Sequence, residues 1–335
     1  MTPTGDDHPL EIGVIGATSW VATDAVLPAL AASPRIRLTA VASRDADAAV
    51  AVATRFGVTH HFGDYGAVID HPDVEAVYVP LPNGAHREWT ERAAAAGKHV
   101  LCEKPLAPTA ADAEVMDAAC RNAGVVLMEA YMTPFHPRAQ ALAAMVAGGV
   151  LGRPLFARTA FTFTLDDPDN YRWRPDQGGG ALLDVGVYCL TPLTDLGGAP
   201  EALAARQAVG PSGVDTTSAG WLEFAGGFSA SFVCSFEAPE HQHLEVVGTA
   251  ATVTVELPFA GGAAGNLARV RRVDGSVEEV GGPDGDPYLA MVEHFAAVVR
   301  GEEAPRHPPG ASVRLLDLVD RLRAAAADRP TGPTT

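Results

Sequence analysis

EIGVIGATSWVA, residues 11–22, is a short apolar run that turns at a glycine into a helical pattern. Gly13, Gly16 and Ala17 are expected at the turn between this first strand and its helix. A strand that enters a helix directly through a glycine turn is typical of the opening of a β-α-β unit. The stretch therefore predicts an α/β fold that begins with a parallel sheet.

The same alternation of strand and helix continues to about residue 132. Short Val/Ile/Leu-rich runs alternate with Ala-rich helical stretches, which predicts a parallel, doubly wound sheet. The five strand candidates are EIGVIG, LTAVAS, AVYVPLP, HVLCEKP and VVLMEAY. Gly57, Gly97 and Gly124 each follow a helical stretch and are expected to end it in a left-handed conformation. Residues 1–131 are therefore predicted to form a Rossmann-type, dinucleotide-binding domain.

Residues 132–335 have a different texture. One Ala-rich helix is followed by runs of period-two alternation, joined by glycine pairs and by turns such as Asp274-Gly275. Two amphipathic helices close the chain. This pattern predicts a second, α+β domain built on a large, mostly antiparallel sheet. Because one apolar face of that sheet should be left uncovered, we expect a homodimer or homotetramer formed through this domain.

Composition restricts the class of protein. The 335 residues suit two domains, and 47% apolar with 19% charged residues indicate a globular protein. No apolar run approaches the roughly 18 residues of a membrane span, and the polar start MTPTGDDHP lacks the features of a secretion signal. A cytoplasmic location is therefore expected. The formal net charge of -17 argues against nucleic acid or a membrane surface as partner.

The four cysteines are expected to be reduced and mostly buried. Cys102, Cys120, Cys189 and Cys234 stand far apart inside apolar segments, without a Cys-x-x-Cys pair or a nearby histidine cluster. This spacing favours neither a disulfide framework nor a metal site.

The first turn predicts a dinucleotide site. A glycine there lets the backbone approach a pyrophosphate, which the helix N-terminus holds through free N–H groups, and Thr18, Ser19 and Trp20 complete the turn. The next strand ends in Ser43-Arg44, and a hydroxyl with a guanidinium suits a 2′-phosphate. NADP(H) is therefore favoured. In the alternative, Arg44 is a surface residue and Asp45 turns to the ribose, which would fit NAD(H).

KHVLCEKPL, residues 98–106, places a charged pair at the end of a buried strand. Ligands of open α/β sheets bind at the carboxyl ends of the strands, so Lys104 is a catalytic candidate. The alternative is that Glu103 and Lys104 belong to an ordinary solvated loop.

The segment QGGGALLDVGVYCLTPL, residues 177–193, carries the second candidate set. Its three glycines allow close backbone approach, and the residues that follow favour a helix on which Asp184 and Tyr188 share one face. In isolation such a pair would be a surface hydrogen bond, but the apolar neighbours indicate a buried helix, where a carboxylate needs a partner. A tyrosine hydroxyl beside the Lys104 ammonium can exchange a proton, because a cation favours the phenolate.

With these motifs, nearly the whole chain resembles the glucose-fructose oxidoreductase, inositol dehydrogenase and rhizopine catabolism group of NAD(P)-dependent oxidoreductases. The marks of the resemblance are Glu103-Lys104-Pro105 and the segments YVPLPNGAHREW, MEAYMTPFHP and GGGALLDVGVY. The chain looks most like the branch of dihydrodiol dehydrogenases, NADP-linked aldose 1-dehydrogenases and 3-ketosugar reductases, which commonly has tyrosine at the position of Tyr188. The turn GATSWVA departs from the family by one extra residue. Trp20 there would cover the cofactor or fill the gap beneath the helix.

The resemblance implies a role for each candidate. Lys104 is the catalytic lysine, Tyr188 the acid/base, and Asp184 orients substrate or lysine. The implied cofactor contacts in this region are Pro80, Leu81, Asn83, His86, Glu103 and Lys104, with Asn83, His86 and Glu103 at the nicotinamide end. The implied sugar pocket consists of His136, Tyr171, Arg172 and Trp173. Aromatic rings pack on the apolar face of a pyranose, and Arg and His bond its hydroxyls; the alternative for each is packing in a long loop.

The reaction implied is reversible hydride transfer between a nicotinamide and a carbinol carbon of a sugar, polyol or sugar nucleotide. Oxidation of an aldose and reduction of a keto-sugar nucleotide both fit the residues. A dinucleotide sensor without catalytic activity on the same fold is the alternative from another class, because a fold alone does not fix function.

Overall fold

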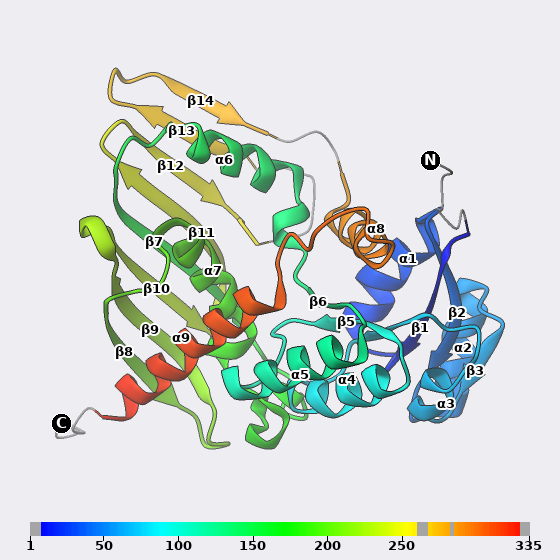
Figure 1. Ribbon diagram of the computed structural model, residues 1–335. Helices are drawn as coiled ribbons and strands as arrows, with labels where there is room; N and C mark the ends of the chain where they lie inside the picture. The colour runs from blue at the N-terminus through cyan, green and yellow to red at the C-terminus, as the bar shows by residue number, and fades with distance from the viewer. Residues whose placement is uncertain (1–7, 260–266, 282–284, 329–335) are drawn as a thin grey trace. The chain divides into compact units, whose positions relative to one another are not determined.

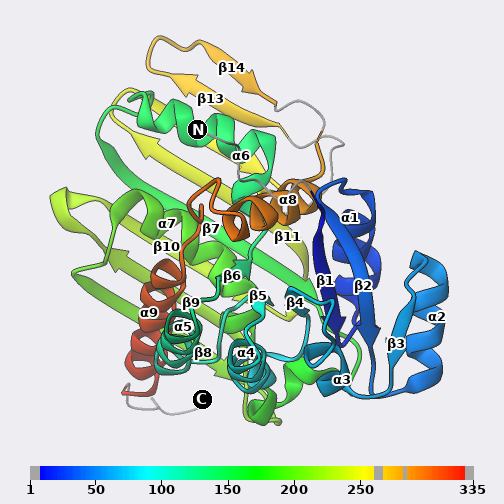
Figure 2. The same ribbon diagram turned by 45° about the vertical axis from the view of Figure 1, so that its right-hand side comes forward.

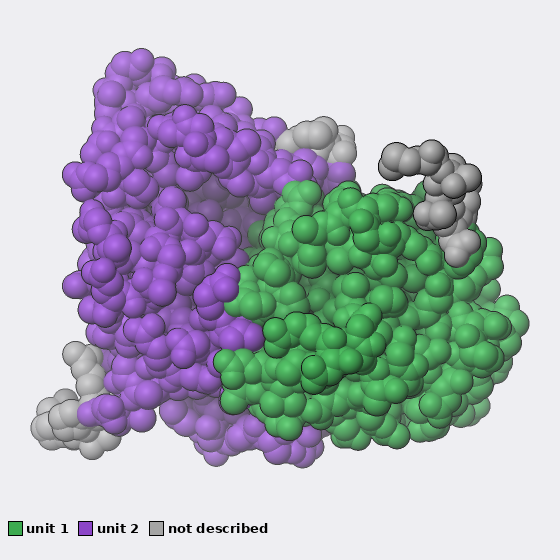
Figure 3. Space-filling model, viewed as in Figure 1, with its two compact units in different colours: residues 1–107, 111–135, 286–312 green, residues 108–110, 136–285, 313–335 purple. Residues whose placement is uncertain are grey.

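The computed structural model describes residues 8–259, 267–281 and 285–328, and the chain forms two compact units. Unit 1 comprises residues 1–107, 111–135 and 286–312, and unit 2 comprises residues 108–110, 136–285 and 313–335 (Figure 3). Within the described ranges, no helix is both long and apolar enough to cross a membrane.

Unit 1 contains a six-stranded sheet in the order β3-β2-β1-β4-β5-β6, with every neighbouring pair parallel (Figure 1). This arrangement confirms the predicted doubly wound sheet. The strands are β1 (Leu10–Ile15), β2 (Ile36–Ala42), β3 (His60–Phe62), β4 (Ala76–Val79), β5 (His99–Glu103) and β6 (Leu127–Ala130). The sequence pattern missed β3, because three residues with two histidines carry no apolar period, and the strand forms only by pairing with β2.

Helices flank the sheet of unit 1, and α1 packs against both α2 and α8 (Figure 2). They are α1 (Leu27–Ala32), α2 (Ala46–Phe56), α3 (Tyr65–Ile69), α4 (His86–Ala95), α5 (Ala110–Ala123) and α8 (Pro287–Val299). Gly57, Gly97 and Gly124 have φ of 69°, 73° and 70°, as predicted for residues that end helices in the left-handed conformation.

Unit 2 contains an eight-stranded sheet in the order β14-β13-β12-β11-β7-β10-β9-β8. The strands are β7 (Pro154–Thr164), β8 (Ala202–Val209), β9 (Asp215–Glu223), β10 (Ser229–Ser235), β11 (Glu237–Gly248), β12 (Ala251–Glu256), β13 (Ala268–Arg272) and β14 (Val277–Val280). Only the central β7–β10 pair is parallel, so the sheet is mostly antiparallel, as predicted. The Ala-rich β8 was not predicted, because alanine has a low strand propensity.

One face of this sheet carries α7 (Val187–Gly197), which contacts β7 and β10, and α6 (Pro137–Ala147), which contacts β14 (Figure 1). The chain then closes with α9 (Pro309–Ala327). Cys234 faces the helical segment at Gly186, so the alternation of the strands turns Trp221 to the other face. That face is mixed, because Trp221, 45% exposed, and Arg158, which pairs with Glu245 at 3.1 Å, lie on either side of Ser231.

All four cysteines are buried and free. Each therefore packs as a small apolar side chain, as the sequence predicted.

Candidate functional site

The turn after β1 is shaped by two glycines with different functions. Gly16 lies at the turn with φ of 65°, and a Cβ there would come within 2.4 Å of Leu81 Cδ2. Gly13 was expected at the turn but lies inside β1, where a Cβ would meet Val68 Cγ1 at 2.4 Å. Its lack of a side chain is explained by packing against α3, so only Gly16 keeps the turn itself open.

The helix after the turn begins with a wide π-helical segment, Ala22–Val26. Ser19 Oγ accepts the Ala22 N–H at 3.3 Å. A π-helical hydrogen bond spans one residue more than an α-helical one. The π-helical segment can therefore take up the extra residue of the turn. Trp20 is 74% exposed, so the interpretation that it fills a gap beneath the helix is wrong. Thr18, in the same turn, is exposed as well.

The end of β2 brings a hydroxyl, a guanidinium and a carboxylate to the same place. Ser43 Oγ lies 3.4 Å from Thr18 Oγ1 and accepts the Asp45 N–H at 3.2 Å. Arg44 is exposed and interacts with Tyr65. Burial of the phenol raises the pKa of Tyr65 and outweighs the Arg44 charge, which lowers that pKa. Asp45 caps α2, since its Oδ1 accepts two N–H groups at 3.0 and 3.1 Å. This capping bond competes with the ribose contact that the NAD(H) alternative requires of Asp45. The open turn and the exposed Arg44 fit a dinucleotide with a 2′-phosphate.

The charged pair at the end of β5 is held by a buried phenol. Glu103 is 6% exposed, and its Oε1 accepts the Tyr78 hydroxyl at 2.6 Å while its Oε2 accepts the Lys104 N–H at 3.2 Å. Burial raises the pKa of Glu103 to about 7, although both donors and the Lys104 charge favour the carboxylate. Tyr288, in the first turn of α8, interacts electrostatically with both Glu103 and Lys104, and burial raises its pKa to about 12.

His86 connects the two loops that follow β4 and β5. It is fully buried, with Nε2 2.8 Å from Leu81 O and Nδ1 3.1 Å from Pro105 O. Burial lowers its pKa, although the carbonyl contacts favour the charged form. His86 thus links the two loops, and its place at the nicotinamide end of the cofactor stays a prediction. Asn83, in the same loop, is also buried.

In unit 2 the glycine triplet brings a loop against the start of a buried helix. A Cβ on Gly179 would lie 2.3 Å from Arg172 O, and Gly180 donates its N–H to the same oxygen at 3.0 Å. Asp215, which the sequence reading missed, accepts the Leu182 N–H at 2.8 Å. The close approach predicted for the glycines is therefore to the chain's own loop at Tyr171–Trp173.

This approach joins Arg172 to Asp184. The helical segment Leu182–Gly186 leads into α7 and buries Asp184 to 4% exposure, and Arg172 Nε donates to its Oδ2 at 2.7 Å. Burial would lower the pKa of Arg172, but Asp184, Tyr171 and Tyr188 outweigh it and raise that pKa. The structure therefore brings Arg172 close to Asp184 and Tyr188. Its guanidinium also lies 4.9 Å from the centre of the Tyr171 ring.

Aromatic rings surround Tyr188. Its ring centroid lies 5.6 Å from that of Phe161 and 5.7 Å from that of Phe259. Tyr188 is 9% exposed, so most of the ring is shielded from water. The sequence reading missed both phenylalanines. Phe161 lies in a period-two run, which indicated a strand but not which ring it would contact.

The other two residues of the predicted sugar pocket lie on different elements. Trp173 Nε1 donates to Asp167 O at 3.0 Å, and its ring packs edge-on against Phe236 at 5.5 Å. His136 caps α6, with its Nδ1 accepting the Arg138 N–H at 3.1 Å. Within unit 2, Arg172 thus links Tyr171 to Asp184.

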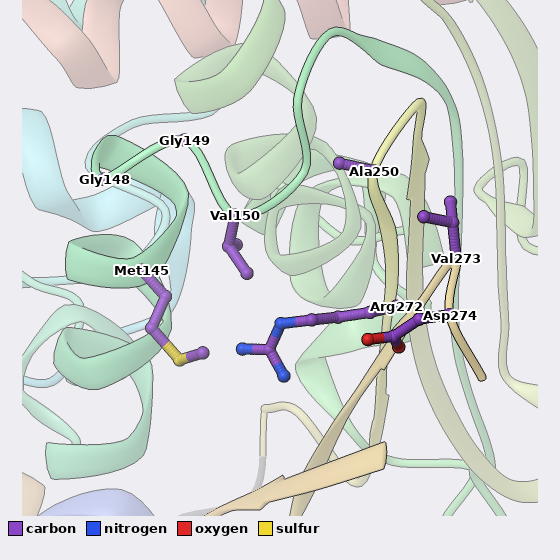
Figure 4. Close-up of a pocket in the computed structure, with 8 residues that line it drawn as sticks. All are labelled: Met145, Gly148, Gly149, Val150, Ala250, Arg272, Val273 and Asp274. Atoms are coloured by element: carbon purple, nitrogen blue, oxygen red, sulfur yellow. The ribbon is translucent and has the colours of Figure 1, made fainter. Parts of the chain in front are cut away.

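A cavity of about 580 Å³ lies elsewhere in unit 2, next to the end of α6 (Figure 4). The Arg272 side chain extends across it towards Met145. Its lining consists of Met145, Gly148, Gly149, Val150, Ala250, Arg272, Val273 and Asp274. No predicted site residue is among them.

Lys104 belongs to unit 1, and Asp184 and Tyr188 belong to unit 2. Their pairing across the two units stays a prediction.

Comparison with known proteins gives relatives along almost the full chain. D-xylose 1-dehydrogenase (NADP(+)) 2 of Haloferax volcanii is 35% identical over 94% of this chain and 96% of its own. The dTDP-3,4-didehydro-2,6-dideoxy-alpha-D-glucose 3-reductase of Streptomyces violaceoruber is 38% identical over 95% of each chain. The crystal structure of a 3-ketoreductase from Actinomadura kijaniata with NADP and TDP-benzene has a TM-score of 0.89 and 33% identity, covering 95% of this chain and 98% of that one.

Two family models match the chain. Residues 10–131 match the oxidoreductase family with an NAD-binding Rossmann fold, and residues 139–254 match the GFO/IDH/MocA C-terminal domain. The resemblance seen in the sequence motifs is confirmed. The chain belongs to the GFO/IDH/MocA family of NAD(P)-dependent oxidoreductases.

Proposed function

We propose that the protein transfers a hydride reversibly between NADP(H) and a carbinol or carbonyl carbon of a sugar, polyol or sugar nucleotide. The observation that carries the proposal is the ion pair between the half-buried Arg172 and the buried Asp184, at 2.7 Å, one helical turn before the shielded Tyr188. A desolvated carboxylate and phenol held by a cation are costly to bury and are typical of proton-handling sites.

In this mechanism, Tyr188 takes the proton of the substrate hydroxyl during oxidation and returns it during reduction. Arg172 holds Asp184 in place, and the Lys104 ammonium stabilises the phenolate. The nicotinamide, when bound, supplies the redox chemistry by accepting the hydride in one direction and returning it in the other. Phe161 and Phe259 exclude water around the tyrosine ring.

Relatives support this assignment of residues. The 3-ketoreductase of Actinomadura kijaniata has also been crystallised with a lysine replaced by alanine and with a tyrosine replaced by phenylalanine. The replaced lysine precedes the replaced tyrosine by the same number of positions as Lys104 precedes Tyr188. The NADP(H) preference is supported by that structure, by the name of the Haloferax volcanii relative and by Arg44 at the end of β2.

The test is to follow NADPH absorbance in both directions across aldoses, polyols and keto-sugar nucleotides. We expect turnover on one of these substrate classes. Lys104→Ala and Tyr188→Phe should each lose that turnover and still bind NADPH. Lys98→Arg, at the only other lysine of the chain, is the matched control. NADPH binding without turnover on any substrate would favour a sensor, and full turnover in both variants would refute the assigned residues.

We further propose that the chain forms a homodimer or homotetramer through the sheet of unit 2. Trp221 supports this, because a 45% exposed indole on the face turned away from α7 leaves apolar area in water. Light scattering of the full chain should give a dimeric or tetrameric mass that Trp221→Arg reduces. A monomer at micromolar concentration would contradict the proposal.

A further inference from the structure

Three side chains with metal-ligating atoms converge at the β3 edge of the sheet in unit 1. His60 lies in β3, and His71 and Asp73 lie in the loop between α3 and β4. One potential ligand atom from each lies within 4.8 Å of the other two. We propose that His60, His71 and Asp73 bind a divalent transition-metal ion of the zinc class.

The strand geometry explains why two of these residues meet. Side chains alternate along β3, so His60 and Phe62 point to one face and His61 to the other. The His71 ring lies on the first face, with its centroid 4.4 Å from that of His60 and 6.1 Å from that of Phe62. His61 is exposed. The fold therefore selects one of the two adjacent histidines for the cluster.

The loop that carries His71 and Asp73 is held in one conformation. Lys98 Nζ donates to His71 O at 3.1 Å and to Val74 O at 2.7 Å, and the Val74 N–H closes a turn onto His71 O at 3.2 Å. The Asp73 N–H donates to His71 Nδ1 at 3.3 Å. In the neutral ring this bond leaves the proton on Nε2, so an ion binds His71 either at Nδ1, in place of the Asp73 N–H, or at Nε2 after the proton has moved to Nδ1. The backbone that carries His71 and Asp73 is thus ordered before an ion arrives.

The set of donors determines the class of ion. Two imidazoles and one carboxylate are the three protein ligands of a known class of zinc site. Water takes the fourth position of the ion in such a site. Zn–N and Zn–O bonds of about 2.0–2.1 Å place tetrahedral ligands about 3.3 Å apart, so ligand atoms that now lie within 4.8 Å of one another must approach by up to about 1.5 Å. Asp73 is exposed and can rotate to close this gap. Mg²⁺ and Ca²⁺ prefer oxygen ligands and are not expected to bind.

An ion at this position would join the edge strand to the loop before β4. β3 has three residues and pairs on one side with β2, so a bond from His60 to the ion adds an attachment on the face of the strand. None of the three ligands is a predicted cofactor or substrate contact. The ion is therefore a stabilising clip for unit 1. The sequence predicted no metal site, because His60 and His71 are far apart in sequence and only the fold brings them together.

The experiment uses the full chain without an affinity tag, treated with a chelator and titrated with Zn²⁺ by calorimetry and with Co²⁺ by visible absorption. We expect one saturable site, the d–d bands of a tetrahedral Co²⁺ complex, and a melting temperature that rises with Zn²⁺ concentration. His60→Ala, His71→Ala and Asp73→Asn should each weaken binding by about tenfold or more. His61→Ala is the matched control and should bind as the unchanged protein does. NADPH turnover should not change in any variant.

His241 and His243 form the alternative ion site to exclude, because their rings, the first exposed and the second half-buried, stack 6.2 Å apart on β11. Loss of binding in His241→Ala with retention in His60→Ala would overturn the proposal. The absence of saturable binding in the unchanged protein would also overturn it. So would an affinity in the three ligand variants equal to that of the unchanged protein. If His60→Ala does not fold, Asp73→Asn, at an exposed position, gives the same reading through the Co²⁺ bands.

Discussion

Replacing Glu103 with glutamine should remove a pH dependence of stability from unit 1. The carboxyl is buried against the Tyr78 hydroxyl, and burial raises its pKa to about 7 from an ordinary value of 4.5. Between these two values the folded protein keeps a proton that the unfolded chain has lost. The free energy of unfolding of the natural protein therefore falls as pH rises through this range and levels off above about pH 7. Glutamine keeps an oxygen acceptor for Tyr78 and has no proton to lose.

The size of the effect follows from the two pKa values. At about 1.4 kcal/mol per pH unit between 4.5 and 7, the ionised Glu103 costs unit 1 about 3 kcal/mol above pH 7. The isoelectric point of the protein is near 4.9, so aggregation restricts the measurement to about pH 5.5 and above. About 2 kcal/mol of the difference is still expected between pH 5.5 and pH 8.

The assay is urea denaturation followed by tryptophan fluorescence in a Trp173→Phe, Trp221→Phe background. Trp20 and Trp89 then report on unit 1 alone. The stability of Glu103→Gln relative to its parent should increase as pH rises from 5.5 to 8. Glu88→Gln, at an exposed position of α4, is the control and should show a constant difference. A constant difference for Glu103→Gln as well would mean that Glu103 is ionised throughout, and would refute the reasoning.

Three further predictions concern the cofactor turn and the ion pair. Arg44→Ala should raise the KM for NADPH by about tenfold or more and leave that for NADH nearly unchanged, because the guanidinium would bind the 2′-phosphate; equal losses for both cofactors would contradict this. NADPH should quench tryptophan emission through the exposed Trp20, and Trp20→Phe should remove most of that quenching; full quenching in the variant would show that Trp20 does not approach the cofactor. Asp184→Asn should destabilise unit 2 by about 3 kcal/mol, because Arg172 loses its buried partner. The control is Asp176→Asn, which breaks the exposed Arg174–Asp176 pair, and Asp184→Asn should melt well below it in thermal denaturation.

The sequence predicted those elements whose apolar pattern is long enough to show a period. β1, β2, β4, β5 and β6 are mostly apolar and mostly buried, as is typical of strands covered on both faces. The missed strands, β3 and β8, both lie at an edge of a sheet. Their residues have little strand preference, and pairing with a neighbour determines their conformation. Such pairing depends on the fold and leaves no local signal.

For the site, the sequence identified positions better than partners. Lys104 was found because it follows the carboxyl end of a buried strand, and Asp184 because a carboxylate stood among apolar residues. The bond from Arg172 to Asp184 could not be found in this way, because it depends on how closely Gly179 and Gly180 approach the Arg172 loop. Gly13 looked like part of the cofactor turn, but its neighbour is Val68, which is distant in sequence.

The return of the chain to unit 1 limits how this protein can be divided. After unit 2, residues 286–312 rejoin unit 1, where α8 packs on α1 with Met291 and Phe295 fully buried. A fragment that ends near residue 135 would therefore leave the apolar surface of α1 in water. Because residues 313–335 belong to unit 2 as well, a chimera that exchanges all of unit 2 between relatives needs junctions near residues 135, 285 and 312, and a cassette of the middle of the chain alone would leave α9 behind.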